Sequence, residues 1–310
     1  MTETCKYLFG PVPSRRLGLS LGVDIVPFKV CTLDCIYCQV GRTTEKTSER
    51  KEYVCPQPVL AELEARLATG LTADYITLSG SGEPTLNSRL GDFLDGIKKL
   101  TDIPVAILTN GTMFSQARVR CDCAKADLVL PSLDAADEQT FEHINHPCPD
   151  ISIENVVSGL SAFREEFTGR IWLEIFFADG VNTGPEQIEK IKQAIDRIGP
   201  DKVQLNTAVR PTAHKDVKMV SSKQLHLIAE RLGENCEVVA DFSHKRCLSH
   251  AENQAQTVLS MLKRRPCSLN DVCTGLGMGQ ERALKYINHF QKQGVVESEK
   301  MGDTIFYKAT

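Results

Sequence analysis

The sequence predicts an α/β protein: a (βα)6 partial barrel, or an open doubly wound sheet, followed by a small winged-helix domain. Short apolar runs alternate with amphipathic helical stretches from residue 22 to about residue 242, and the pattern then changes to three helices and a hairpin. The length of 310 residues and a composition with 42% hydrophobic and 25% charged residues suit two folded domains. We expect these domains at residues 1–250 and 251–310.

The expected strands are short, apolar and partly β-branched, as buried parallel strands are. They cover residues 22–27, 74–79, 104–109, 128–131, 171–177 and 202–207, with a seventh candidate at 237–240. Between them apolar residues recur at helical spacing, for example at Leu90, Phe93, Leu94 and Ile97. Repeated β-then-α units imply a parallel sheet, and six complete units fit the partial barrel. Periodicity alone leaves the open sheet as an alternative.

The C-terminal segment has the element order of a winged helix. Helices are expected at residues 254–264, 268–276 and 279–293, and strands at 295–299 and 304–308. Residues 251–310 hold 8 Lys+Arg against 6 Asp+Glu, and the first 250 residues hold 28 against 34. This supply of cations is thin for a DNA-binding domain, because phosphate contacts dominate nucleic-acid affinity. We therefore expect recruitment of an RNA or peptide substrate, or protein contact, at least as strongly as DNA binding.

Composition restricts the class of protein further. The net charge of −4 argues against a protein that works mainly by covering nucleic acid or anionic lipid. No run approaches 18 apolar residues and the N-terminus has no signal-peptide pattern, so we expect a cytoplasmic protein without a membrane partner. The chain has 12 cysteines, and a reducing compartment would keep them from forming disulfides. Metal binding, redox chemistry or burial must therefore account for them.

Three of the cysteines stand close together after the first expected strand, at Cys31, Cys35 and Cys38. Parallel α/β folds place their chemistry at this carboxyl end of the sheet. A cubane iron–sulfur cluster normally takes four cysteine ligands, so three would leave one iron open for catalysis. A structural zinc site would need a second ligand pair, which does not follow at zinc-ribbon spacing. A thioredoxin-like pair would use Cys35 and Cys38 alone and leave Cys31 unexplained.

The spacing Cys31-x3-Cys35-x2-Cys38, with Tyr37 before the third cysteine, resembles the signature of the radical S-adenosylmethionine superfamily. The resemblance implies a partial TIM barrel, a [4Fe-4S] cluster on these cysteines and S-adenosylmethionine chelated to the open iron, with Tyr37 near the adenine. One electron, from a donor such as flavodoxin or ferredoxin, would cleave the sulfonium. The resulting 5′-deoxyadenosyl radical would abstract a substrate hydrogen.

A second segment resembles the same family in the expected order along the chain. Gly80, Ser81, Gly82 and Glu83 follow the second expected strand and resemble the glycine-rich motif whose backbone receives the methionyl amine. The alternative is a turn before the next helix. Further candidates for contacts with the cofactor or substrate stand at the ends of later strands: Asn110, Ser132, Asp134, Glu174 and Asn206.

Two of these candidates have competing interpretations. Asp134 fits helix N-capping equally well, and Asn110 stands in what could be only a helix-entry turn. Glu174 interrupts an apolar strand, so we expect it to face the barrel interior with a partner.

Residues 7–18, together with residues 80–85 and the Arg210-Pro211 pair, are similar to the branch of the superfamily that makes the tricyclic wyosine base of tRNA. Arg15 and Arg16 are candidates to bind a substrate phosphate or carboxylate, and Arg210, at the end of the sixth expected strand, is a candidate to contact adenosine or substrate. For Arg15 and Arg16 the alternative is solvated surface. The wyosine enzymes resemble proteins with a second, upstream cluster, and this chain has only Cys5 there. A second cluster would have to draw on Cys5, Cys55, Cys121, Cys123 or Cys148.

Three classes of function are consistent with these motifs. The first is a radical S-adenosylmethionine enzyme acting on RNA, a peptide or a small molecule. The second is an activase that installs a glycyl radical on a partner enzyme. The third is a non-catalytic iron–sulfur redox sensor that binds DNA through its C-terminal domain. A sensor has no need of the glycine-rich loop, so the first class explains most of the chain.

Overall fold

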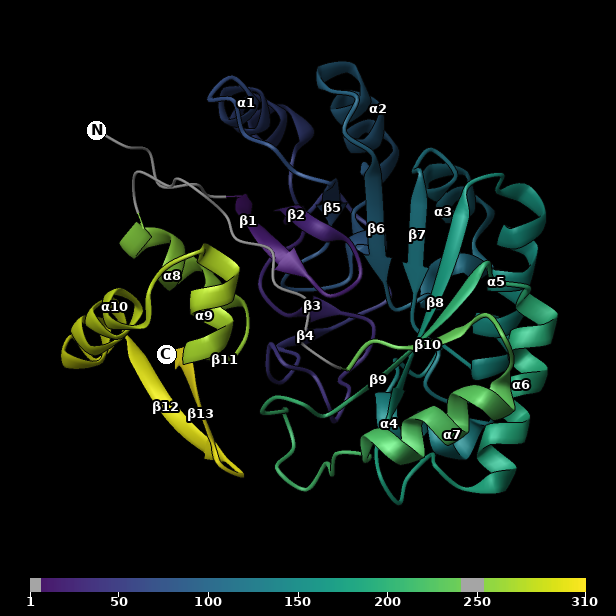
Figure 1. Cartoon of the computed structure of the whole chain (residues 1–310). Helices are drawn as coiled ribbons and strands as arrows, with labels where there is room; N and C mark the ends of the chain where they lie inside the picture. The colour runs from purple at the N-terminus through teal and green to yellow at the C-terminus, as the bar shows by residue number, and fades with distance from the viewer. Residues whose placement is uncertain (1–6, 241–253) are drawn as a thin grey trace.

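The computed structural model describes residues 7–240 and 254–310. An eight-stranded sheet with strand order β1-β2-β5-β6-β7-β8-β9-β10 forms its centre (Figure 1). Strands β2 to β10 of this sheet run parallel, and β1 is an antiparallel edge strand. The bounds are β1 Leu8–Ser14, β2 Gly18–Val23, β5 Tyr75–Leu78, β6 Val105–Thr109, β7 Leu128–Pro131, β8 Arg170–Phe177, β9 Lys202–Thr207 and β10 Cys236–Val238.

Helices cover the outer face of the curved sheet (Figure 1). They are α1 Pro56–Leu67, α2 Leu90–Leu100, α3 Ala117–Cys123, α4 Glu138–Asn145, α5 Ile153–Glu166, α6 Pro185–Ile198 and α7 Ser222–Leu232. Their apolar faces and the outward side chains of the strands form one continuous core. No helix in residues 7–240 or 254–310 is long and apolar enough to cross a membrane.

The predicted parallel βα architecture is confirmed, and it is the partial barrel rather than the open sheet. The first strand, however, was predicted at residues 22–27, whereas β2 is Gly18–Val23 and residues 24–27 lie beyond the sheet. Strand β1 was not predicted, because Pro11 and Pro13 interrupt its apolar pattern. Proline lacks the N–H that a central strand needs, and an edge strand tolerates it.

An apolar plug fills the amino-terminal end of the barrel. Leu17, in the turn between β1 and β2, packs with Ala106, Leu128 and Leu130 from the starts of β6 and β7. Trp172 of β8 lies against the same group. Tyr75 of β5 lies against this group as well, and its hydroxyl accepts from Arg170 at 3.0 Å, so this end of the barrel is mainly apolar.

The C-terminal part has its own apolar core and a small antiparallel sheet, ordered β11-β13-β12. Its elements are α8 Gln254–Arg264, β11 Cys267–Ser268, α9 Leu269–Leu276, α10 Gln280–Lys292, β12 Val296–Met301 and β13 Thr304–Ala309. The three predicted helices and two predicted strands are confirmed, and only the two-residue β11 was missed. The predicted domain boundary at residue 250 lies outside the described residues. The assignment as a winged-helix domain stays a prediction.

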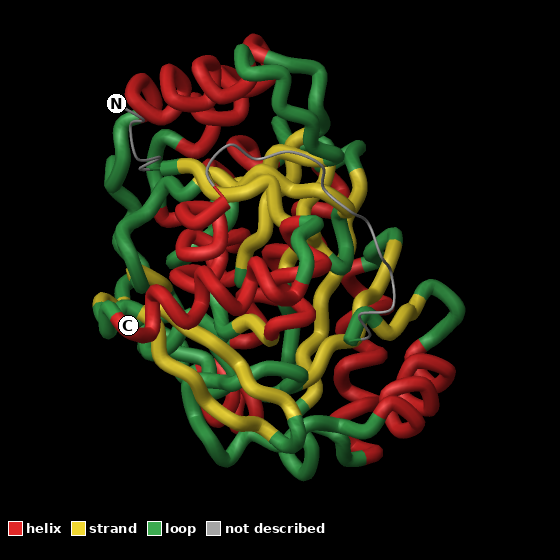
Figure 2. Tube along the Cα trace, turned by 60° about the vertical axis from the view of Figure 1, so that its left-hand side comes forward, coloured by secondary structure: helices red, strands yellow, loops and turns green. Residues whose placement is uncertain are grey.

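This C-terminal part packs against the β1 edge of the barrel (Figure 2). Gly275 of α9 lies so close to Pro13 of β1 that an added Cβ would stand 3.1 Å from the proline ring. Arg210, in the segment after β9, forms an ion pair of 3.2 Å with Asp271, and both side chains are buried. Asp271 also completes a capping box with Ser268 at the start of α9. The Asp271 carboxylate therefore stabilises both the start of α9 and the contact between the barrel and the C-terminal part.

We predict that Asp271→Ala destabilises the protein by about 3 kcal/mol or more, because it leaves Arg210 buried without this partner and removes the cap. Chemical denaturation followed by tryptophan fluorescence and circular dichroism measures the change. Asp303→Ala, in the exposed turn between β12 and β13, is the matched control and should change stability little. Equal stabilities of the two variants would contradict the structural importance of the ion pair.

Candidate functional site

The cysteine loop, residues 31–38, lies at the carboxyl end of the barrel directly after β2. Cys31 ends the two-residue strand β3 (Val30–Cys31), which pairs with β4 (Glu45–Lys46). The Cys38 N–H donates to the Cys35 carbonyl at 3.1 Å, so the loop turns tightly between these two residues. Cys31, Cys35 and Cys38 are all half-buried, and their thiols are close enough to influence one another electrostatically.

The chemistry of these thiols fits a cluster better than a single ion. Among the described residues, no three His, Cys, Asp or Glu side chains are placed to hold one metal ion. In a polynuclear cluster, by contrast, each cysteine holds a different iron, so the sulfurs need not converge on one point. Burial raises the pKa of the Cys31 thiol to about 12 and that of Cys35 well above its usual value. A bound metal would be needed to hold these groups as thiolates at neutral pH.

Each of the three sulfurs accepts a hydrogen bond from a different side chain. Lys29 Nζ donates to Cys38 Sγ at 3.1 Å, Asn145 Nδ2 to Cys35 Sγ at 3.3 Å, and Asn110 Nδ2 to Cys31 Sγ at 3.5 Å. Hydrogen bonds of this kind to ligand sulfurs are among the features that set the reduction potential of iron–sulfur clusters. The cysteine loop therefore has the hydrogen bonds to sulfur that are typical of an iron–sulfur redox site.

The glycine loop, residues 80–83, packs directly on the backbone of the cysteine loop. The Glu83 N–H donates to the Val30 carbonyl at 3.0 Å. A Cβ added at Gly82 would lie 2.1 Å from that same carbonyl oxygen, so only glycine fits. Gly80 has φ +143°, and a Cβ there would meet the Asp24 carboxylate. The two segments that the sequence singled out are thus in contact, in the expected order.

Glu83 is buried, and its carboxylate accepts three hydrogen bonds at Oε1 and one at Oε2. It accepts from the Thr85 and Thr109 hydroxyls at 2.6 Å each, from the Thr85 N–H at 3.0 Å and from the Asn110 N–H at 2.7 Å. Burial raises the pKa of Glu83, and these hydrogen bonds oppose that change. Glu83 therefore joins the carboxyl ends of β5 and β6 and orients the loop that carries Asn110.

Tyr37 and Asp134 form a second buried group beside the cysteines. The Tyr37 hydroxyl donates to Asp134 Oδ2 at 2.5 Å, and its ring stacks on Phe176 with centroids 3.9 Å apart. Asn145 Nδ2 donates to Asp134 at 2.7 Å as well as to Cys35, so one amide links the carboxylate to the cysteine loop. Burial raises the pKa of Asp134 to about 6. The helix-capping interpretation of Asp134 is wrong, because Asp137 caps α4.

The middle of the barrel holds a charged network that combines four of the predicted residues. Arg16 forms an ion pair with Glu174, and Asn206 Nδ2 donates to Glu174 Oε1 at 2.9 Å. Arg15 donates to Asn206 Oδ1 at 3.1 Å. Burial and the neighbouring Arg210 lower the pKa of Arg15 to about 9. Glu174 faces the interior as expected, and the interpretation of Arg15 and Arg16 as solvated surface is wrong.

The remaining predicted residues lie around these groups. Ser132, half-buried after β7, is paired with Glu174 through a parallel backbone bridge. Asn110 Nδ2 also donates to Thr32 Oγ1 at 2.7 Å within the cysteine loop. Arg210 does not pair with Glu174, the carboxylate of the charged network. It forms its ion pair with Asp271 of the C-terminal part instead.

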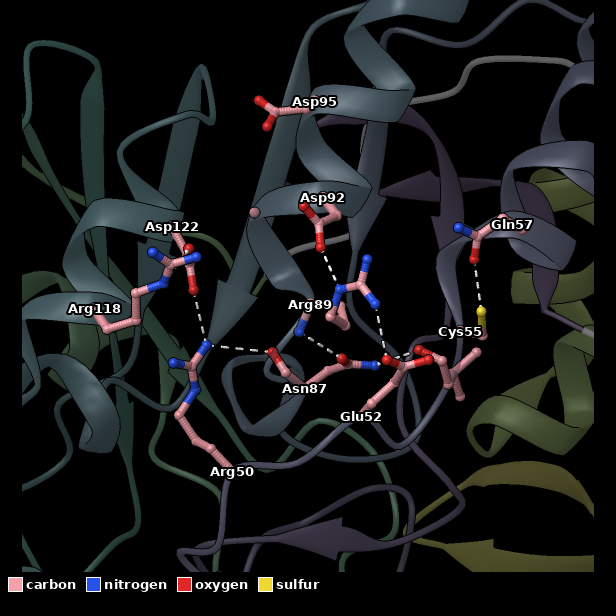
Figure 3. Close-up of polar contacts among 12 residues, drawn as sticks. Arg50, Glu52, Cys55, Gln57, Asn87, Arg89, Asp92, Asp95, Arg118 and Asp122 are labelled. Atoms are coloured by element: carbon pink, nitrogen blue, oxygen red, sulfur yellow. Dashed lines mark hydrogen bonds and ion pairs between the residues drawn. The ribbon is translucent and has the colours of Figure 1, made fainter.

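Polar contacts anchor the segment that follows the cysteine loop to the helices beside it (Figure 3). Arg50 donates to the Asn87 carbonyl at 3.3 Å and forms an ion pair of 2.9 Å with the buried Asp122 of α3. Glu52 pairs with Arg89 at 2.9 Å, just before α2. Arg50 also donates to the Thr85 carbonyl at 2.8 Å, two residues beyond the glycine loop. This segment therefore holds the glycine loop in place from its outer side.

Lys29, Asn145 and Asp24 were missed by the sequence analysis. Lys29 lies two residues before Cys31, and a cation so close to three cysteines could have been predicted to contact them. Asp24, which accepts from the Ser81 hydroxyl at 2.7 Å, was assigned to a strand instead. Asn145 ends α4, more than one hundred residues from Cys35, and nothing local in the sequence marks it.

A comparison with protein families gives the class that this fold and site define. The Radical SAM superfamily matches residues 25–198, more than half of the chain, and the chain belongs to that superfamily. Its members bind a [4Fe-4S] cluster and S-adenosylmethionine, and the chain is an enzyme of this class. Within it, the chain belongs to the UPF0026 family. A UPF0026 protein of Methanocaldococcus jannaschii is 32% identical over 306 residues, with 96% of this chain and 94% of the relative covered.

A further relative is much longer than this chain. A protein of Brachyspira hyodysenteriae named GTPase Obg is 34% identical over 305 residues, covering 97% of this chain. The chain spans only 45% of that relative's length. No Gly-Lys dipeptide, the core of the G-x-x-x-x-G-K-[ST] phosphate-binding loop, occurs in the present sequence. The sequence of this chain therefore lacks the phosphate-binding loop that the name GTPase would lead one to expect.

Solved structures of low sequence identity share the fold. The structure of TYW1 with a lysine-pyruvate adduct bound is similar at a TM-score of 0.54 and 19% identity, over 74% of this chain and 76% of that one. Streptococcus suis SuiB bound to S-adenosylmethionine is similar at a TM-score of 0.53 and 15% identity, over 72% and 51%. These neighbours support the partial TIM barrel.

We predict that Gly82→Ala separates the glycine loop from the cysteine loop, because the new methyl group would overlap the Val30 carbonyl oxygen. The expected loss of stability is about 1–3 kcal/mol, with lower iron retention during gel filtration of the reconstituted protein. Gly184→Ala is the matched control, because an added Cβ there meets no atom within 4 Å. Full iron retention in Gly82→Ala would show that the contact does not shape the site.

Proposed function

We propose that Cys31, Cys35 and Cys38 hold the [4Fe-4S] cluster of this radical S-adenosylmethionine enzyme and that its reaction modifies RNA. The observation that carries the proposal is the cysteine loop, whose three sulfurs each have an N–H donor and whose backbone pairs with the glycine loop. When bound, the reduced cluster supplies the electron that cleaves S-adenosylmethionine to the 5′-deoxyadenosyl radical, which abstracts a substrate hydrogen. The electron would come from a small donor such as flavodoxin or ferredoxin.

The chain's own residues would position the cofactor. The glycine loop places backbone groups beside the cysteine loop, unshielded by side chains at Gly80 and Gly82 and with Ser81 between them. These backbone groups could accept hydrogen bonds from the methionyl amine. The stacked ring of Tyr37, fixed by Asp134, offers a flat apolar face beside the cluster ligands. Glu83 would orient the glycine loop through Oε1, and Oε2, whose partner is the Asn110 N–H, could accept one further hydrogen bond.

The charged network would bind the substrate below the cofactor. Glu174 and Arg16 keep 18% and 17% of their side-chain surface exposed although they lie inside the barrel, so solvent reaches them. Asn206 and Ser132 add neutral hydrogen-bonding groups on either side. Together these groups suit a polar substrate fragment that presents both donors and acceptors, such as a nucleobase with its ribose.

We assign recruitment of RNA to the C-terminal part, as a winged-helix domain. Arg282, Lys285, His289 and Lys292 are exposed on α10 at spacings that place them on one face. The helix lies on the side of this part that faces away from the barrel (Figure 1). Three Lys and Arg side chains on one face are few for a nucleic-acid surface, but their shared sign favours a polyanion over a neutral peptide.

The same part also reaches the cysteine loop. Lys308, Glu297 and Phe306 line a cavity of about 160 Å³ together with Cys38 and Arg42. The hairpin of the C-terminal part thus lies beside the proposed cluster, whereas α10 faces away from it, so an RNA bound on α10 would have to extend past the hairpin to reach the cluster.

The cluster assignment predicts that anaerobically reconstituted protein holds about four irons per chain and releases 5′-deoxyadenosine from S-adenosylmethionine with a strong reductant. Alanine at Cys31, Cys35 or Cys38 should abolish this release, and Cys55→Ala, at an exposed cysteine elsewhere, should retain it. Turnover in all three loop variants would refute the assignment. A stable cluster without turnover, combined with DNA binding, would favour the redox sensor, and a glycyl radical formed on a partner enzyme would favour the activase.

The RNA assignment predicts that Arg282→Ala combined with Lys285→Ala and Lys292→Ala weakens binding of bulk tRNA and makes the affinity less dependent on salt. Filter binding at several salt concentrations measures both quantities. The control is alanine at Lys99, Lys215 and Lys223, which are exposed on the barrel part and change the net charge equally. Equal weakening in both triple variants would show that binding is unspecific. Absence of tRNA binding by the wild type would redirect the search to peptide substrates.

A further inference from the structure

Lys29 is a buried cation whose partner is a cysteine. Its side chain is only 4% exposed, and its ammonium donates to Cys38 Sγ at 3.1 Å. Within the described part of the chain, no carboxylate lies within ion-pair distance of Lys29. Burying an ammonium without an anion is costly, so this position requires negative charge that the neighbouring carboxylates do not supply.

The backbone holds Lys29 in this position in a strained conformation. Its φ is +57°, in the left-handed region that non-glycine residues rarely adopt. Four hydrogen bonds fix it there. The Lys29 N–H donates to the Ser81 carbonyl at 2.8 Å, and the Lys29 carbonyl accepts from the Thr44 and Glu45 N–H groups at 3.2 Å each and from the Thr44 hydroxyl at 3.4 Å. The contact with Ser81 means that the glycine loop itself sets the direction of the lysine.

We propose that Lys29 is the fixed counter-charge of the cluster and a positioning residue that raises its reduction potential. The inference rests on the proposed function, because it requires thiolates and a cluster at Cys31, Cys35 and Cys38. One-electron reduction adds negative charge to the cluster, and a cation fixed beside a ligand sulfur stabilises the reduced form more than the oxidised form.

The other two sulfurs show why Lys29 is distinct. Cys35 and Cys31 accept from the neutral side-chain amides of Asn145 and Asn110. Among the described residues, Lys29 is therefore the cation that donates to a sulfur of the loop. A neutral donor strengthens the bond to sulfur in both redox states, whereas a full charge acts more strongly on the state with more negative charge.

The test compares Lys29→Met, Lys29→Gln and Lys29→Arg in the reconstituted full-length chain, without S-adenosylmethionine. The midpoint potential is measured by redox titration followed by electron paramagnetic resonance, with iron and sulfide counted in each sample. We expect Lys29→Met and Lys29→Gln to lower the equilibrium constant for reduction about tenfold, or about 59 mV for a one-electron couple. Lys29→Arg should stay near the wild type. Lys51→Met, at a lysine whose side chain is 47% exposed, is the control and should leave the potential unchanged.

The outcomes separate this inference from the proposed function. A wild type that takes up no cluster refutes the proposed function. A wild type with a full cluster, together with neutral variants of unchanged potential, refutes only the counter-charge. If neither neutral variant takes up iron while Lys29→Arg does, a requirement for charge at this position is supported. If Lys29→Arg also fails, or shifts as far as Lys29→Met, the charge is not the reason for the lysine.

Discussion

The site depends on the backbone pairing between the glycine loop and the segment that leads into the cysteines. Two hydrogen bonds, from Glu83 to Val30 and from Lys29 to Ser81, join the carboxyl end of β5 to the start of the cysteine loop. This contact allows no side chain at Gly82, and it fixes the strained backbone at Lys29. The proposed cluster site and the proposed cofactor site therefore meet at this pair of backbone segments. A displacement of the glycine loop would displace the cysteine loop, and the reverse also holds.

The barrel interior is organised in layers along its axis. Leu17 and its neighbours close the amino end with apolar side chains. The ion pair of Arg16 with Glu174 lies in the middle of the barrel, where both side chains keep some contact with solvent. The cysteine loop and Tyr37 occupy the carboxyl end, where parallel α/β folds place their ligands.

The sequence predicted the order of the elements and the local motifs well, and it failed where partners are distant along the chain. Apolar periodicity located the strands of the large sheet after β2 but missed the two-residue strands β3 and β4, and cysteine spacing located the loop. Proline hid β1, because an edge strand needs fewer of its N–H groups than the pattern assumes. Asn145 lies near Cys35 only because β7 and α4 fold back over the loop. The pairing of Arg16 with Glu174 likewise joins the turn between β1 and β2 to β8, which lies several strands away in the sheet, so no local pattern could reveal it.

The packing of α8 and α9 on β1 gives the C-terminal part a second consequence, independent of any ligand. Strand β1 is the antiparallel end of the large sheet, and an open sheet edge is a template for pairing with another chain. Pro11 and Pro13 already remove two donors from this edge, and the helices shield it further. A barrel produced without residues 254–310 would expose this edge and the Arg210 side chain together. The C-terminal part therefore covers a sheet edge that would otherwise be open to pairing with another chain.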